Sequence, residues 1–148
     1  FEDHFKFSSL KIVIVFINTH THKQIYDAKI ELVNLDPGCS EKPNYYSYGL
    51  HPWYINAGDY HQKLDELRIS VHEKRCLAVG ECGLDKLSTV PMDLQEEVFV
   101  EQIRIANQIK KPLIIHCVKA FNELFNCLNL NDNEMPVIIH GYNNNENI

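Results

Sequence analysis

Short apolar runs, separated by polar stretches, recur along the whole chain. They are rich in Val, Ile, Leu and Tyr, as the two-sided buried strands of a parallel sheet are. Six strands are therefore predicted, at Ile12–Ile17, Lys29–Leu35, Tyr46–Leu50, Leu77–Gly80, Leu113–His116 and Val137–His140.

Segments with helical periodicity lie between the later strands. They predict helices over residues 59–74, 92–110 and 118–129. In the first of these, Leu64, Leu67 and Val71 recur at helical spacing, and Asp59 precedes them as an expected N-cap.

The alternation of strand and helix implies parallel βαβ units and an α/β fold. The first two connections, around residues 23–28 and 36–44, are too short for full helices. We therefore expect the beginning of the architecture to be irregular.

Composition describes an ordinary globular protein with no broad basic surface. The chain has 148 residues, of which 45% are hydrophobic and 23% charged, and one domain is the expectation. The formal net charge is −6, so bulk electrostatic attraction would not hold a nucleic acid. Phosphate chemistry would need a local positive charge, such as metal ions.

The cysteine pattern argues against a disulfide framework. There are five cysteines, an odd number, and no two of them have CxxC spacing. We expect free thiols and a reducing, cytoplasmic location. No apolar run approaches transmembrane length, so no membrane partner is expected. Residues 1–10 carry no motif and are expected to be a leader of uncertain order.

Polar side chains with ligand or acid–base chemistry stand at the ends of four predicted strands. In a parallel α/β barrel these ends converge on one mouth, where catalytic groups lie. The residues are His20, His22, Glu81, His116 and His140, with His51 at the end of a fifth strand. Any one of them alone is more often a hydrogen-bonded packing residue or a loop carboxylate, but together they predict a metal site.

The pairing of His20 with His22 has a geometric consequence. Two residues apart on an extended backbone, their side chains leave the same face and can hold one ion. The mixed nitrogen and oxygen donors suit zinc, manganese or iron and not calcium. Five ligands exceed the three of a catalytic zinc site, so a two-metal site bridged by Glu81 is expected. His51, before Pro52, either braces its loop or contacts substrate.

Several motifs together resemble the TatD-type metal-dependent DNase family, a branch of the amidohydrolase-like barrels. The resemblance runs from about Phe16 to Tyr142, on the segments "NTHTH", "GLHPW", "VGECGLD", "LQEEVFVEQIRIA", "KPLIIHC" and "VIIHGY". It implies a TIM-barrel-like metal-dependent hydrolase fold and an exodeoxyribonuclease that uses two divalent ions, magnesium, manganese or zinc, on DNA.

The resemblance also implies roles for single residues. His20 and His22 would hold one ion, Glu81 would bridge both and act as a catalytic residue, and His116 and His140 would hold the second ion. His51 would contact substrate. So would Lys119, which stands where the family often has Arg; lysine keeps the charge and loses bidentate phosphate recognition.

Length is the largest departure from the family. A barrel of this kind has about 250 residues, whereas six strands are predicted here, and the family's final metal-binding Asp is not found. We expect residues 1–148 to be a single domain truncated at its C-terminus, an incomplete barrel with about six of eight strands. Such a fragment is expected to be inactive alone, and its oligomeric state is left open.

Two other functional classes remain open at this point. One is a barrel hydrolase of C–N or C–O bonds, although such enzymes often bridge their metals with a carboxylated Lys rather than a Glu. The other is a non-catalytic remnant that binds metal poorly.

Overall fold

The computed structural model describes residues 17–23, 30–37, 39 and 42–142. It contains six strands, β1 Ile17–Thr21, β2 Ile30–Leu35, β3 Tyr46–Tyr48, β4 Cys76–Asp85, β5 Leu113–Val118 and β6 Val137–Ile139. Its helices are α1 Tyr60–Ser70, α2 Met92–Ile109 and α3 Phe121–Leu130.

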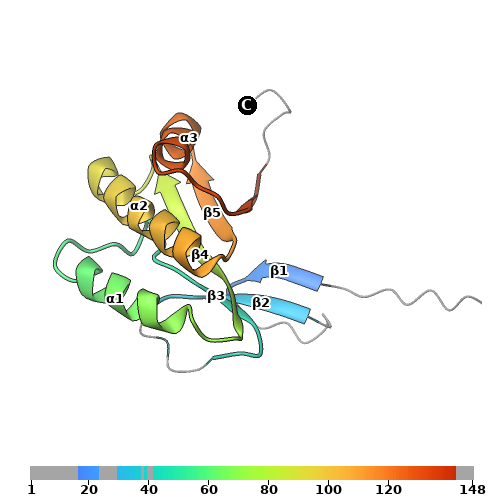
Figure 1. The fold of residues 1–148 in the computed structure, drawn as a ribbon. Helices are drawn as coiled ribbons and strands as arrows, with labels where there is room; N and C mark the ends of the chain where they lie inside the picture. The colour runs from blue at the N-terminus through green and yellow to red at the C-terminus, as the bar shows by residue number, and fades with distance from the viewer. Residues whose placement is uncertain (1–16, 24–29, 38, 40–41, 143–148) are drawn as a thin grey trace, which may run out of the picture.

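The strands form one sheet in which every neighbouring pair is parallel. Their spatial order, β1-β2-β3-β4-β5-β6, is their order along the chain. The sheet curls, and the three helices follow one another along one side of it (Figure 1). This arrangement confirms the predicted α/β fold, six strands of an incomplete TIM-like barrel, and it brings the carboxyl ends of the strands to one edge.

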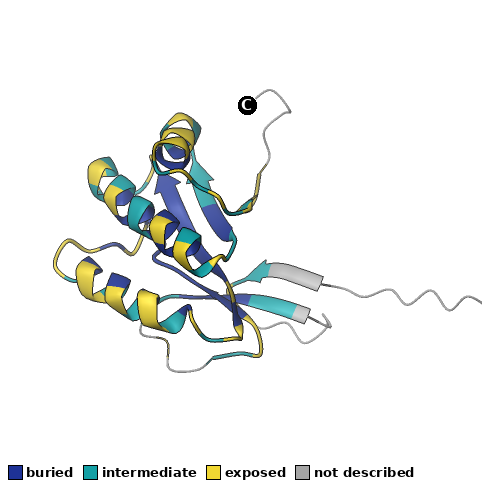
Figure 2. Ribbon diagram, viewed as in Figure 1, coloured by how far each residue is buried: buried dark blue, intermediate teal, exposed yellow. Residues whose placement is uncertain are grey.

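The core lies between β4, β5 and the inner faces of the helices (Figure 2). In β4 every residue except Leu77 is buried. Helix α2 contributes Phe99 and Ile103, both fully buried, and α1 contributes Leu64 and Leu67. The apolar positions that predicted the helices therefore face the sheet, as expected from their spacing.

Only β2 ends where predicted: β3 ends at Tyr48 instead of Leu50, β6 ends at Ile139 instead of His140, and three strands run further than predicted. Strand β4 does not stop at Gly80 but continues to Asp85, and β5 continues to Val118. Strand β1 extends to Thr21, so His20 lies within the strand rather than after it. Most of the predicted Ile12–Ile17 strand, Lys29 and the predicted leader lie outside the described residues. The sequence pattern predicts His20 and Glu81 just after a strand and His116 at the last position of one, whereas all three lie inside strands.

Helix α2 starts at Met92, as predicted, whereas the other two helices start later than predicted. Helix α3 begins at Phe121 and α1 at Tyr60. Asp59 occupies the N-cap position of α1, but its side chain makes no capping hydrogen bond and lies 3.1 Å from the Lys63 ammonium. In the described part of the β2–β3 connection there is no helix, as predicted.

All five cysteines are free thiols, which confirms the predicted absence of disulfides. Cys39 is exposed, whereas Cys76, Cys82 and Cys127 are buried. Among the described helices none has the length and apolar character needed to cross a membrane.

Candidate metal centre

Glu81 lies in the middle of β4, where the strand comes unusually close to β5. Gly80 and Gly83 have φ values of 139° and 130°, which favour glycine. A Cβ at Gly80 would lie 2.3 Å from the carbonyl oxygen of Ile114, and one at Gly83 would lie 2.2 Å from that of His116. The glycines of "VGECGLD" thus allow the close approach that sets Glu81 beside His116.

The Glu81 carboxylate is 1% exposed and faces four imidazoles. Its Oε2 atom lies 3.0 Å from Nε2 of His20 and 3.4 Å from Nε2 of His22. Its Oε1 atom lies 3.1 Å from Nδ1 of His116 and 3.8 Å from Nε2 of His51. Each carboxylate oxygen therefore has its own pair of histidines.

These contacts define two groups of donor atoms that share Glu81. The first group is His20, His22 and Glu81, and the second is His51, Glu81 and His116. Within each group the ligand atoms lie within 4.8 Å of one another. The structure thus brings together four of the five predicted ligands and adds His51 to them.

His140 stands beside the first group rather than within either one. Its ring centroid lies 4.1 Å from that of His20. His140 and His116 line the same cavity, of about 430 Å³, together with His22, His51 and Glu81. The ring is therefore at the site, and its assignment as a ligand stays a prediction.

Asp85, at the end of β4, was missed by the sequence analysis. Its Oδ2 atom lies 3.0 Å from Nε2 of His116, and it accepts a hydrogen bond of 2.6 Å from the indole N–H of Trp53. The backbone N–H of Leu87 donates to Oδ1 at 2.7 Å. A signal for it was present, because residues four apart on a strand share a face, and Asp85 is four residues after Glu81.

The pairing of His116 with Asp85 is the usual support of a metal-bound histidine. Such a ring donates one N–H to a carboxylate, which fixes the orientation of the other nitrogen. Here Nε2 donates to Asp85, and Nδ1 is left facing the Glu81 carboxylate. At 3.1 Å Nδ1 can donate to Glu81, and it would become a ligand atom once it loses that proton while Nε2 keeps its bond to Asp85.

His51 has the opposite arrangement. The backbone N–H of Trp53 donates to Nδ1 of His51 at 3.2 Å. Burial, together with the charge of His116, lowers the pKa of His51 to about 4, so the ring is neutral near pH 7. With Nδ1 accepting, the neutral ring carries its proton on Nε2, the atom that faces Glu81. Its geometry favours a hydrogen-bond donor over a metal ligand.

The charges at the centre are strongly coupled. Burial alone would raise the pKa of Glu81, but hydrogen bonds from His116 and His20 outweigh it and hold the pKa below its ordinary range. Burial alone would lower the pKa of His116, but hydrogen bonds to Glu81 and Asp85 raise it. Glu81 is therefore ionised near neutral pH, and the neighbouring histidines stabilise this buried anion.

Two glutamines of α2 hold the segments that carry these residues. The Gln102 side chain accepts from the backbone N–H of Leu50 at 2.8 Å and donates to its carbonyl at 3.2 Å. The Gln95 side chain makes the same pair of bonds with Asp85, at 2.8 and 3.1 Å. Seven residues apart, the glutamines share one face of the helix, and they fix Asp85 and the residue before His51.

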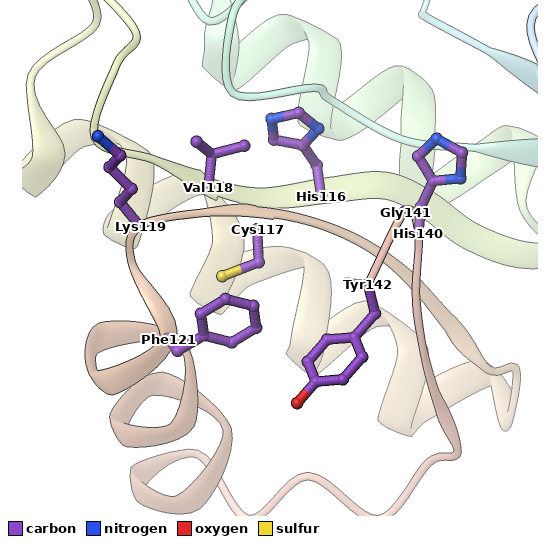
Figure 3. Close-up of a pocket in the computed structure, with 8 residues that line it drawn as sticks. All are labelled: His116, Cys117, Val118, Lys119, Phe121, His140, Gly141 and Tyr142. Carbon is purple, nitrogen blue, oxygen red and sulfur yellow. The ribbon is translucent and has the colours of Figure 1, made fainter. Parts of the chain in front are cut away.

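Lys119 lines a second cavity, of about 530 Å³, that also contains His116 and His140 (Figure 3). In Figure 3 the side chains of Lys119 and His116 leave the β5 segment on the same side. Lys119 has a φ of 54°, a left-handed conformation, and among the described residues no carboxylate forms an ion pair with it. Its ammonium is thus available to an anionic ligand near the metal centre.

The donor set fits divalent cations. A buried carboxylate between imidazoles supplies nitrogen and oxygen ligands of the kind that zinc, manganese and iron accept. The support of His116 by Asp85 is the further feature expected of such a site. An arrangement of this kind would be costly as mere packing, because it removes an ionised carboxylate from water.

The chain is similar to known proteins along nearly its whole length. Residues 5–148 match the family described as TatD related DNase. The human 3'-5' RNA nuclease TATDN2 is 36% identical over 80 residues, which are 53% of this chain and 10% of that protein. The 3'-5' ssDNA/RNA exonuclease TatD of Cronobacter sakazakii is 34% identical over 74 residues, which are 49% of this chain and 27% of that protein.

A solved structure shows the same fold. The crystal structure of YjjV, a TatD homologue from Escherichia coli K12, superposes with a TM-score of 0.72 at 21% identity. The match covers 88% of this chain and 61% of that one, so the chain spans less than two thirds of its relatives' length. With the family match extending over all but the first four residues, this chain belongs to the TatD-related DNase family.

Proposed function

We propose that the protein is a two-metal phosphodiesterase that removes nucleotides from an end of single-stranded DNA. The observation that carries this proposal is the single buried carboxylate of Glu81, with one oxygen toward His20 and His22 and the other toward His116. One carboxylate with separate donors on each oxygen is the arrangement that a bridging ligand needs.

Each residue then has a distinct task. His20 and His22 would hold one ion, Glu81 would serve both, and His116 would hold the second ion through Nδ1 while Asp85 fixes its ring. The family resemblance assigns His140 to the second ion, whereas its ring lies against His20 of the first group. Two divalent ions a few Å apart supply the charge that polarises a phosphodiester and a water molecule. The family relationship and the names of the relatives support nucleic acid as substrate.

Two cationic or donor groups would orient the phosphate. His51 presents its Nε2 proton into the cavity and donates to a phosphate oxygen, and it stays neutral because its pKa is about 4. Lys119 supplies a point charge from the adjoining cavity. Both act by binding and orientation, which place the reacting phosphate against the attacking water.

Hydrolysis of C–N or C–O bonds is the second candidate. The donor set alone would serve either reaction, because a carbonyl oxygen is polarised as a phosphate oxygen is. The names of two relatives, an RNA nuclease and an ssDNA/RNA exonuclease, favour the nuclease.

The test compares two variants of the complete gene product, including any residues before 1 or after 148. Glu81→Gln should bind both metals more weakly and lower cleavage of single-stranded DNA by roughly a thousandfold or more, since the ions supply several kcal/mol of charge stabilisation. His51→Ala should keep its metal content and lose activity only through positioning.

Metal analysis and an end-labelled oligonucleotide assay in magnesium, manganese or zinc give both readouts. Equal metal loss in the two variants would refute the assignment of Glu81 and His51. No metal-dependent cleavage of DNA or RNA by the complete protein would refute the nuclease proposal.

A further inference from the structure

Two large aromatic side chains stand exposed at the rim of the metal-centre cavity. Trp53 is 53% exposed and Tyr54 is 61% exposed. Both line the cavity that contains Glu81, His51 and His116. Aromatic rings left in water beside a polar cavity signify a binding surface when they are held in place.

Hydrogen bonds fix the Trp53 ring and the backbone of the loop that follows β3, which carries both aromatic residues. The indole N–H of Trp53 donates to Asp85, and the backbone N–H of Tyr54 donates to the carbonyl of His51 at 3.0 Å. The Ser88 hydroxyl donates to the carbonyl of Pro52 at 3.4 Å. The loop is therefore organised before any ligand arrives, which lowers the cost of binding.

The rings are also close to the reacting centre. The ring centroid of His51 lies 5.1 Å from that of Trp53 and 5.5 Å from that of Tyr54. The centroid of Trp53 lies 5.5 Å from that of His116. A base that stacks on these rings would belong to a nucleotide next to a phosphate bound at the metal centre around Glu81.

The overall charge of the chain does not attract nucleic acid, and stacking on these rings can supply an attraction instead. The net charge of −6 gives no bulk attraction for a polyanion. Stacking on aromatic side chains holds single strands regardless of sequence, because every base has a π face. Bases within a duplex do not offer those faces.

From these observations we propose that Trp53 and Tyr54 form a stacking platform for the bases of single-stranded nucleic acid next to the reacting phosphate. This proposal rests on the proposed nuclease function and adds the residues that select single strands. The platform is linked to the predicted ligand His116 through Asp85, since Trp53 and His116 bond the same Asp85 oxygen.

The test is binding in EDTA, where no metal-dependent cleavage occurs. The complete protein is titrated into a labelled oligothymidylate, an abasic strand of the same length, and a duplex, with fluorescence polarisation as the readout. Tyr54→Ala should weaken oligothymidylate binding by about 5- to 150-fold, the range of one lost base stack. Tyr54→Phe should bind as the wild type does.

The abasic strand supplies the decisive comparison. It should bind the wild type more weakly than oligothymidylate does, and the difference between the two strands should be smaller in Tyr54→Ala, which keeps only the Trp53 ring. Trp53 is the only tryptophan among the 148 residues. Quenching of tryptophan fluorescence by oligothymidylate that occurs in the wild type and is absent in Trp53→Phe therefore reports contact of Trp53 with bases.

Three results would each overturn the platform. They are equal affinity of wild type and Tyr54→Ala for oligothymidylate, binding of the duplex by the wild type as tightly as oligothymidylate, and no measurable binding by the wild type. A uridylate strand shows whether RNA binds the platform as DNA does. Cleavage is measured separately with metal, so normal stacking without cleavage would refute the nuclease function and leave the platform standing.

Discussion

Gln102 makes a sharp test of how helix α2 supports the site. Its side chain is fully buried and makes two hydrogen bonds to the backbone of Leu50, the residue before His51, besides a longer one of 3.5 Å to the carbonyl of Val98. In Gln102→Leu, a substitution of similar size, the N–H and carbonyl of Leu50 lose their partners in a buried position.

The magnitude follows from the two groups left without partners. Each buried unsatisfied polar group costs about 1–3 kcal/mol, so the free energy of unfolding should fall by about 2–6 kcal/mol. That is a large share of the roughly 5–15 kcal/mol that stabilises a typical domain. Gln102→Glu keeps the acceptor for the Leu50 N–H and loses the donor to its carbonyl, so its effect should also be destabilising.

Urea unfolding monitored by circular dichroism gives the free energies. Gln62→Leu is the matched control, because Gln62 is exposed on α1 and bonds only Glu66 nearby; its effect should stay within about 0.5 kcal/mol. A change at Gln102 no larger than that of the control would refute the reasoning. In the complete protein, Gln102→Leu should lower the cleavage rate through displacement of His51 while metal content stays near normal.

Three further outcomes are expected. Asp85→Asn should lower metal affinity by about 10- to 100-fold, because His116 loses the carboxylate that orients it; an unchanged affinity in metal titrations would contradict this. Gly83→Ala should destabilise the protein by about 1–3 kcal/mol in urea unfolding, since the new Cβ would lie 2.2 Å from a backbone oxygen; a neutral effect would show that β4 and β5 can separate freely. Native Cys39 should react quickly with a thiol reagent and Cys82 only after unfolding, because Cys39 is exposed and burial raises the pKa of Cys82; equal rates would count against the buried assignment.

The sequence predicted the order and type of the elements because apolar runs and helical periodicity are local signals. It misplaced the end of β4 because Glu81 and Asp85 look like loop residues, whereas both lie in a strand covered on both faces. Burial of a carboxylate within a sheet is favourable only when partners from other strands surround it. Those partners are not visible in any window of sequence.

At the site too, features with a local sequence signal could be predicted, and features that depend on contacts in the folded chain could not. His20, His22 and His116 could be predicted as a set because each stands in a motif near a strand end. The tautomer of His51 could not be predicted, since it depends on a backbone N–H two residues later. Asp85 was not predicted because the strand was expected to end at Gly80, which would leave Asp85 in a loop; its position four residues after Glu81 places both on one face of β4.

The strictly sequential order of the sheet bears on how the chain folds. Every strand pairs with its neighbour in sequence, so the sheet can grow one strand at a time through fairly local contacts. The contacts of Glu81 with His20 break this pattern, because they join strands that are not neighbours and lie far apart in the chain. Bound ions would fasten the first strand to the middle of the sheet, so backbone amides of β1 should exchange with deuterium more slowly when metal is present, while those of β4 change least.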